Sequence, residues 1–382
     1  MLKSMQGVVR LAAIFSLAMS GFFGLPLVAQ AQDIVIGQVG PFTVIPVPDA
    51  IEVNQGMKAY IAQINKSGGI QGRKLSVFEL DDRYSGDEFV ARFAEAMQRK
   101  PVALISPIGS AAIKRMLDDK LLDKYDVVVM NAIPGAEAFR DPGHPRLFHV
   151  RVGDKQQIEK LVNHARTLGI TRLAVLHQDI AIGTSGMKVV ADEVARVKGL
   201  DVKGFQSTAD LTAMAAASQE LAKSNPQGVL VLGAPRFMAD GVAQLRKAGI
   251  SQSIFVLSYV PPALIVKLAG SAAARGVGIA QTFPNPNGKT KTLMREFQAA
   301  MKISFPDLKD YTPFQLEGYL STRIVGEALK RARDAKPESL VRALQSMGEL
   351  DFDGYRVDFS KNNAGSRFVD IAVVDTDGRL RY

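Results

Sequence analysis

The sequence alternates between short apolar runs and longer amphipathic segments, and this alternation restricts the fold more than any other feature. The apolar runs are continuous, as in parallel strands that are covered on both faces. The segments between them have helical length and pattern. A repeated strand–helix order favours an α/β doubly wound architecture. We expect strands over residues 34–38, 74–80, 102–105, 127–130, 173–176, 202–205, 229–232 and 255–257.

Helix-capping patterns mark where several helices begin. Ser85 is followed three residues later by Glu88, and Thr312-Pro313-Phe314-Gln315 combines a cap, a first-turn proline and a reciprocal glutamine. Asp154 with Gln157 predicts a further cap. The sequence therefore predicts helices over residues 54–65 and 156–168, one from Pro313 to about 333, and one over 337–347, before strands over 354–359 and 368–375.

The first 31 residues have the order of parts of a secretory signal peptide. Lys3 and Arg10 precede an apolar stretch over residues 11–28, and Ala29-Gln30-Ala31 fits a cleavage site of small residues. A membrane anchor is the alternative, but the glycines and the proline inside the apolar stretch argue against it. We expect residues 1–31 to be removed and the protein to be periplasmic.

The chain has no cysteine, which excludes disulfides, thiolate ligands and thiol catalysis, and we expect no lipid anchor on a cysteine. The formal net charge is +9, with basic and acidic residues interleaved rather than clustered. This pattern indicates a solvated surface, so we expect no nucleic-acid partner. The 4 histidines have no metal-ligand spacing, and we expect neither a metal nor a cofactor.

No motif of nucleophilic or nucleotide-dependent catalysis is present, so the sequence predicts no catalytic residues. Asp81-Asp82 could do acid–base work, but a structural role in the turn after a strand is the better interpretation. His177, at the end of another strand, is better explained as a structural histidine. An exported enzyme that uses Asp81, Asp82 or His177 is the alternative.

In doubly wound sheets, ligands bind beyond the C-terminal ends of the strands. One such place follows the strand over residues 102–105, where Pro107-Ile108-Gly109-Ser110 leads into a helix. A helix N-terminus with a nearby glycine and hydroxyl suits a negatively charged group. The alternative is that Ser110 only caps this helix.

Four stretches together resemble a known family. They are Ile36-Gly37-Gln38-Val39-Gly40-Pro41, the run Asn65-Lys66-Ser67-Gly68-Gly69-Ile70-Gln71-Gly72-Arg73-Lys74, Asp81-Asp82, and Arg246-Lys247-Ala248-Gly249-Ile250. The chain is similar to the substrate-binding proteins of ABC importers, in the branched-chain amino-acid-binding (leucine/isoleucine/valine-binding-like) group. The resemblance covers essentially all residues after the first 31.

The resemblance implies the type I periplasmic binding fold: two Rossmann-like lobes joined by a three-strand hinge. One lobe would hold residues 33–151 and 282–360, and the other residues 152–281 and 361–382. A small-molecule ligand would bind between the lobes, which close on it without chemistry. The implied partner is an ABC permease of the inner membrane, and we expect a monomer.

The resemblance also implies where a ligand carboxylate binds. The loop Ser106–Ala111 and the turn Ala132–Gly135 match segments that receive it in relatives, so the Ser110 hydroxyl and the amides of Gly109 and Ala111 are expected to do so here. Two residues depart from the family pattern, and both stand where relatives bind the ammonium of the ligand. Ile182 stands where the family has tyrosine, and Tyr259 where it has glutamate.

A buried ammonium without a carboxylate or an aromatic face is costly. We therefore expect a small organic acid, aromatic or aliphatic, without an α-ammonium, with Tyr259 offering one hydrogen bond and an apolar face. Amino-acid binding remains an alternative because Asp154 matches an ammonium contact of some relatives; a receptor domain that feeds a signalling protein is another. The expected ligand-binding residues are Phe42, Tyr84, Ile108, Gly109, Ser110, Ala111, Ala132, Ile133, Pro134, Ile182, Ala234, Tyr259 and Phe283.

Overall fold

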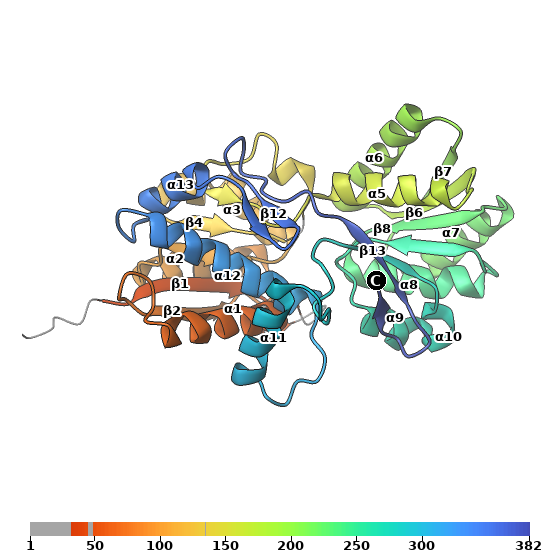
Figure 1. Ribbon diagram of the computed structural model, residues 1–382. Coiled ribbons are helices and arrows are strands. Elements are labelled where there is room, and N and C mark those ends of the chain that lie inside the picture. The colour runs from red at the N-terminus through yellow and green to blue at the C-terminus, as the bar shows by residue number, and fades with distance from the viewer. Residues whose placement is uncertain (1–31, 45–48, 134) are drawn as a thin grey trace, which may run out of the picture. The chain divides into compact units, whose positions relative to one another are not determined.

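The computed structural model describes residues 32–44, 49–133 and 135–382 (Figure 1). The predicted signal peptide and Pro134 lie outside these residues. The first sheet has five parallel strands in the order β2-β1-β3-β4-β5. They are β1 (Ile34–Gly40), β2 (Leu75–Asp81), β3 (Ala103–Ile105), β4 (Val128–Met130) and β5 (Leu147–Phe148).

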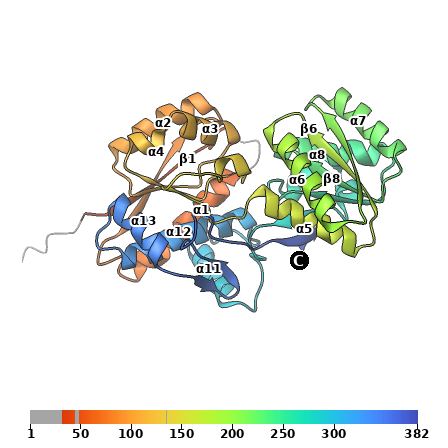
Figure 2. The same cartoon turned by 90° about the horizontal axis from the view of Figure 1, so that it is seen from above.

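Helices cover both faces of the first sheet. Figure 2 shows α2, α3 and α4 on one side and α1, α12 and α13 on the other. The helices that alternate with these strands are α1 (Asp49–Lys66), α2 (Gly86–Gln98), α3 (Ser110–Asp118), α4 (Leu121–Lys124) and the 3₁₀ turn η1 (Glu137–Phe139).

The second sheet has seven strands in the order β14-β13-β10-β9-β8-β6-β7. Its parallel part repeats the strand order of the first sheet, and β13 and β14 add an antiparallel edge. The strands are β6 (Arg172–Gln178), β7 (Asp201–Ser207), β8 (Gly228–Leu232), β9 (Ser253–Val256), β10 (Gly278–Gln281), β13 (Asp370–Val374) and β14 (Leu380–Arg381). The helices are α5 (Asp154–Thr167), α6 (Ala181–Val197), α7 (Leu211–Lys223), α8 (Pro235–Lys247), α9 (Pro262–Ala269) and α10 (Ser271–Ala274).

After β10 the chain returns to the first sheet. It forms α11 (Thr292–Ser304), α12 (Pro313–Arg331), α13 (Pro337–Ser346) and the hairpin of β11 (Leu350–Phe352) and β12 (Tyr355–Val357). Helices α11 and α12 pack on α1, and α13 packs on β4, before the chain ends in the second sheet. The α/β doubly wound class is confirmed.

The closest helix packing in the first sheet's layer joins α1 and α12. A Cβ on Gly56 would lie 1.8 Å from the carbonyl oxygen of Gln315, and one on Gly318 would lie 1.9 Å from that of Val53. The absence of side chains at these two glycines lets the helix backbones touch, which positions α12 over the sheet.

The predicted strands agree with the structure to within a few residues at their ends, and two of the predicted caps are confirmed. The Ser85 hydroxyl accepts from the backbone N–H of Glu88 at 3.4 Å, and Thr312 with Gln315 forms a full capping box. The third prediction is wrong: Gly153 is the N-cap of α5, and its N–H donates to Oε1 of Gln156 at 3.0 Å. Asp154 instead begins the helix and turns its carboxylate inward.

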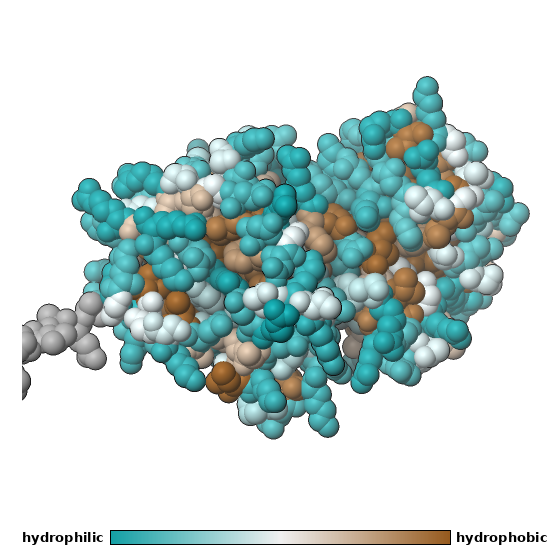
Figure 3. Space-filling view, viewed as in Figure 1, coloured by the Kyte–Doolittle hydropathy of each residue, from teal (hydrophilic) through white to brown (hydrophobic). Residues whose placement is uncertain are grey.

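Other boundaries differ where the local pattern was weak. Helix α1 begins five residues before the expected start at Asn54, and the short strands β5, β10, β11 and β14 were not expected. Two to four residues carry too little periodicity to be recognised. Figure 3 shows a mostly hydrophilic face with scattered hydrophobic residues, in keeping with the interleaved charges. Among the described helices, none combines the length and apolarity needed to cross a membrane.

Glu52 on α1 makes stability depend on pH. Burial raises the pKa of its carboxyl from 4.5 to about 7, although Oε2 accepts a hydrogen bond from the Thr312 hydroxyl at 2.8 Å. The folded state therefore keeps a proton that the unfolded chain loses, and the free energy of unfolding falls as pH rises from about 4.5 to about 7. We expect Glu52→Gln to gain stability relative to the parent protein at about pH 8, and not at about pH 4.

Urea unfolding at the two pH values measures this difference. The exposed Glu220 on α7 provides the control, because Glu220→Gln removes a carboxyl whose side chain is 63% exposed. An equal effect of Glu52→Gln at both pH values would contradict the prediction.

Candidate functional site

Asp81 holds together the loops that follow β1 and β2, at the C-terminal edge of the first sheet. Its Oδ1 accepts from the backbone N–H of Phe42 at 2.9 Å and of Arg83 at 3.1 Å, and its Oδ2 accepts from the Thr43 hydroxyl. Partial burial opposes ionisation, but these hydrogen bonds outweigh it and lower the pKa of Asp81.

Asp82 organises the same turn from inside the protein. It is fully buried, accepts from the N–H of Tyr84 at 2.8 Å, and burial raises its pKa to about 6. These contacts confirm the structural interpretation of Asp81-Asp82. His177 is buried in β6 of the other sheet, where burial lowers its pKa. The three residues of the enzyme alternative thus belong to two different sheets.

The loop after β3 presents Ser110 to solvent. The N–H of Gly109 donates to the carbonyl of Ile133 at 2.8 Å, which joins this loop to the one after β4. Gly109 has a φ of 114° and is the N-cap of α3, without a side-chain cap. Ser110 is the first helical residue and is exposed, so the alternative that it only caps the helix is wrong.

Tyr84 covers the same loop. A Cβ on Gly109 would lie 3.1 Å from Cε2 of Tyr84, so the aromatic ring rests on the glycine. Tyr84 is 44% exposed, and Phe42 from the neighbouring loop is half-buried. The first sheet therefore offers an aromatic and hydroxyl-bearing surface beside the N-terminus of α3.

Two of the expected apolar residues lie at the corresponding edge of the second sheet. Ile182 is buried in the first turn of α6, and Ala234 is half-buried before α8. The N–H of Ala234 donates to Oε1 of Gln178 at 2.8 Å, so the end of β6 supports the loop after β8.

Tyr259 lies in the loop after β9, and every hydrogen-bonding site of its hydroxyl is occupied. The hydroxyl donates to Asp154 and accepts from the N–H of Gly135 at 2.8 Å and from Nε2 of Gln157 at 3.3 Å. A phenol has one donor and two acceptor sites, so none remains. The expectation that Tyr259 offers a ligand one hydrogen bond is therefore wrong, because its hydroxyl bonds only to residues of the protein. Burial and the Asp154 charge raise the pKa of the phenol.

The remaining expected residues divide by burial. Phe283 is fully buried and stacks on Tyr355, with ring centroids 5.3 Å apart. Of the expected ligand-binding residues, those with exposed or half-buried side chains are Phe42, Tyr84, Ser110, Ala111 and Ala234. Those that are buried are Ile108, Ala132, Ile133, Ile182, Tyr259 and Phe283.

Sequence reasoning missed a buried ion pair beside these loops. The side chain of Arg151 is 2% exposed and that of Glu317 is 1% exposed. Nε of Arg151 lies 2.9 Å from Oε1 of Glu317, and Nη2 of Arg151 donates to Oε2 of Glu317 at 3.1 Å. Asn131 donates to Glu317 at 2.7 Å and accepts from the N–H of Arg151 at 2.9 Å. Burial lowers the pKa of Arg151, but Glu317 together with the nearby Tyr259, Asp154 and Tyr355 outweighs it, and the net shift is upward. Neither residue stands in a recognisable motif.

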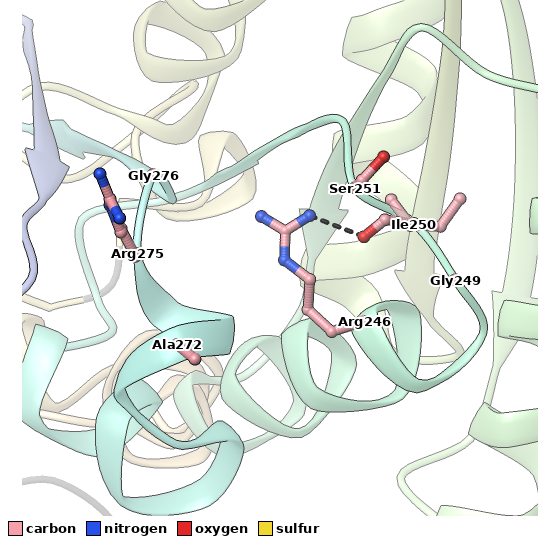
Figure 4. Close-up of a pocket in the computed structure, with 7 residues that line it drawn as sticks. All are labelled: Arg246, Gly249, Ile250, Ser251, Ala272, Arg275 and Gly276. Atoms are coloured by element: carbon pink, nitrogen blue, oxygen red, sulfur yellow. Dashed lines mark hydrogen bonds between the residues drawn. The ribbon is translucent and has the colours of Figure 1, made fainter.

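The pocket in Figure 4 lies elsewhere, at the N-terminal ends of β9 and β10. It has a volume of about 470 Å³ and is lined by Arg246, Gly249, Ile250, Ser251, Ala272, Arg275 and Gly276. Arg246 donates to the carbonyls of Ile250 and Gln252 at 2.7 and 2.9 Å, so its guanidinium fastens the loop that precedes β9. Within the described residues, no group of three or more acidic or histidine side chains could hold a metal ion.

Comparisons with known proteins agree with this architecture. Residues 33–379 match the family described as periplasmic binding protein. The chain belongs to this family, and within it to the branched-chain amino-acid-binding group with the type I fold. It is 24% identical to a leucine-, isoleucine-, valine-, threonine- and alanine-binding protein of Pseudomonas aeruginosa, over 91% of this chain and 93% of that protein.

Solved structures are also similar over nearly the whole chain, including the following two. An extracellular ligand-binding receptor from Verminephrobacter eiseniae is 56% identical, with a TM-score of 0.88, over 92% of this chain and 100% of that one. A substrate-binding periplasmic protein from Ralstonia solanacearum is 25% identical, with a TM-score of 0.81, over 91% and 99%.

Removal of one partner of the buried ion pair should destabilise the protein strongly. Glu317→Gln keeps the size of the side chain but leaves the Arg151 charge uncompensated, so we expect a loss of about 3–5 kcal/mol. The double variant Arg151→Met, Glu317→Leu removes both charges and should recover part of this loss. Urea unfolding measures all three proteins; a double variant no more stable than the single one would contradict the account.

Proposed function

We propose that this protein is the periplasmic solute-binding component of an ABC importer. A small organic ligand would bind between the loops at the C-terminal ends of the two sheets. The observation that carries the proposal is the joined set of loops after β1 to β4, with exposed Ser110 at the start of α3. The relative from Pseudomonas aeruginosa, which binds amino acids, supports a role in solute capture.

Two lobes would close on the ligand. We assign residues 33–151 and 282–360 to one lobe and residues 152–281 and 361–382 to the other. The return of α11 to α13 to the first sheet and of β13 and β14 to the second supports this division. Closure needs only contacts that are better in the closed state.

The ligand class follows from the polar groups near Tyr259. Burial raises the pKa of Asp154, one oxygen of which already accepts from Tyr259, so it is poorly suited to hold an ammonium. Ile182 adds only apolar surface. We therefore favour a carboxylate without an α-ammonium, its negative group at Ser110, Ala111 and the positive end of α3. The expected contact with the Gly109 amide is wrong, because that N–H already donates to the carbonyl of Ile133.

An α-amino acid is the second candidate. Oδ2 of Asp154 is buried and has no hydrogen-bond partner among the described residues, and an ammonium could donate to it. A sensory role would use the same binding site. Permease and ATPase genes beside the coding gene would support transport, and a kinase gene would support sensing.

A thermal-shift screen of residues 32–382, refolded to remove bound ligand, separates the two ligand classes. The panel holds leucine-type amino acids, their deaminated acids and simple aromatic acids. Ligand at 100 times its dissociation constant adds about 2.7 kcal/mol of stability. We expect the acids to raise the melting temperature and the amino acids not to; the reverse result would overturn the carboxylate assignment.

Ser110→Ala tests the position of the ligand's negative group. Loss of a hydrogen bond to a charged group should weaken binding of the best acid about 10- to 100-fold. Ser251→Ala, in the pocket at the opposite edge of the second sheet, is the matched control and should bind as the parent does. Calorimetry measures both variants, and equal affinities would remove Ser110 from the site.

A further inference from the structure

The Tyr259 hydroxyl joins the loops of the two sheets directly. Gly135 follows β4 in the first sheet, and Tyr259 follows β9 in the second. The backbone N–H of Gly135 donates to the Tyr259 hydroxyl at 2.8 Å, and both residues are buried. This contact therefore links the two sets of loops between which we propose that the ligand binds.

The Tyr259 end of this link is held firmly. Asp154 and Gln157, in the first turns of α5, both bond the hydroxyl. Gln157 also accepts from the N–H of Ser258 at 3.0 Å, which fixes the backbone beside the tyrosine. The guanidinium carbon of Arg151 lies 4.9 Å from the centre of the ring. These contacts tie the Tyr259 side chain to α5 and to the segment before it.

The Gly135 end is held close to the segment that connects the two sheets. Its carbonyl accepts from the N–H of Asp154 at 2.9 Å, and a Cβ on Gly135 would lie 3.0 Å from Cα of Gly153. The loop thus rests against the chain where it passes from β5 to α5. Rotation of the first sheet away from α5 would have to break the bond to the Gly135 carbonyl and the bond from Gly135 to the Tyr259 hydroxyl, and the hydroxyl supplies one of these two restraints.

We infer that Tyr259 is a positioning residue that restrains the opening of the two sheets through its hydroxyl. This inference rests on the proposed binding between the sheets. A residue that contacts the ligand changes the affinities of different ligands unequally. A residue that sets the share of binding-competent molecules changes all affinities by one common factor. Tyr259, whose hydroxyl has no bonding capacity left, belongs to the second kind.

The restraint can be measured without any ligand. Because the chain has no cysteine, Lys114→Cys on α3 and Lys188→Cys on α6 give a unique pair of sites for spin labels. The two lysine side chains are 67% and 75% exposed, so the labels should not disturb the core. Pulsed electron spin resonance then reports the distribution of distances between the two sheets' helices.

In this labelled protein, Tyr259→Phe keeps the ring and removes only the hydroxyl. We expect its distance distribution to broaden and shift to longer values. The matched control is Tyr319→Phe, which deletes another buried hydroxyl, bonded to Gln63 at 2.7 Å between α12 and α1 of the first sheet's layer. The control should reproduce the parent distribution.

A Tyr259→Phe distribution identical to the parent's, or an equal shift in Tyr319→Phe, would overturn the inference. Gln157→Leu loosens the same hydroxyl without altering Tyr259, and it should give a smaller shift in the same direction; it decides the matter if Tyr259→Phe does not fold. The test is separate from the proposed ligand class, because a failed ligand screen leaves the measured distances unaffected.

Discussion

The connections between the two sheets are held by the buried pair of Arg151 and Glu317. Arg151 lies in the segment from β5 to α5, and its Nη2 also donates to Thr282, in the segment that leaves β10, at 3.2 Å. Glu317 belongs to α12. Burial of two charges is costly unless each is paired and hydrogen-bonded. Here the charges are paired and Glu317 also accepts from Asn131, although Nη1 of Arg151 has no hydrogen-bond partner among the described residues. The pair fastens two of the connections between the sheets to one helix.

A second layer of polar contacts is built on this pair. The Arg151 guanidinium faces the ring of Tyr259, whose hydroxyl joins Asp154, Gln157 and Gly135. The groups that hold the connections in place are thus bonded to the loops between which we propose that the ligand binds. The surface that we propose for the ligand lies on the loops around Tyr84, Gly109 and Ser110, and Asp81 and Asp82 hold the neighbouring turn in place.

The sequence predicted where the residues at the ends of strands lie, but it predicted their roles less well. Asp81 and Ser110 could be assigned to the sheet edge because parallel strands place their C-terminal ends together. Tyr259 was recognised as a departure from the family pattern, but its hydroxyl forms hydrogen bonds with residues more than 100 positions away in the sequence. Phe283 looked like a wall residue, yet it stacks on Tyr355, and nothing local to either residue indicates that contact.

The sequence by itself determined the α/β class, most strands and the caps at Ser85 and Thr312, because these depend on the pattern of a few consecutive residues. Only the tertiary structure decided that Arg151 meets Glu317 and that Tyr259 meets Gly135. Such contacts arise from how strands and helices far apart in the chain are packed, and that packing leaves no local periodicity. The fold could therefore be anticipated from the residues, whereas the contacts that join the two sheets' loops could not.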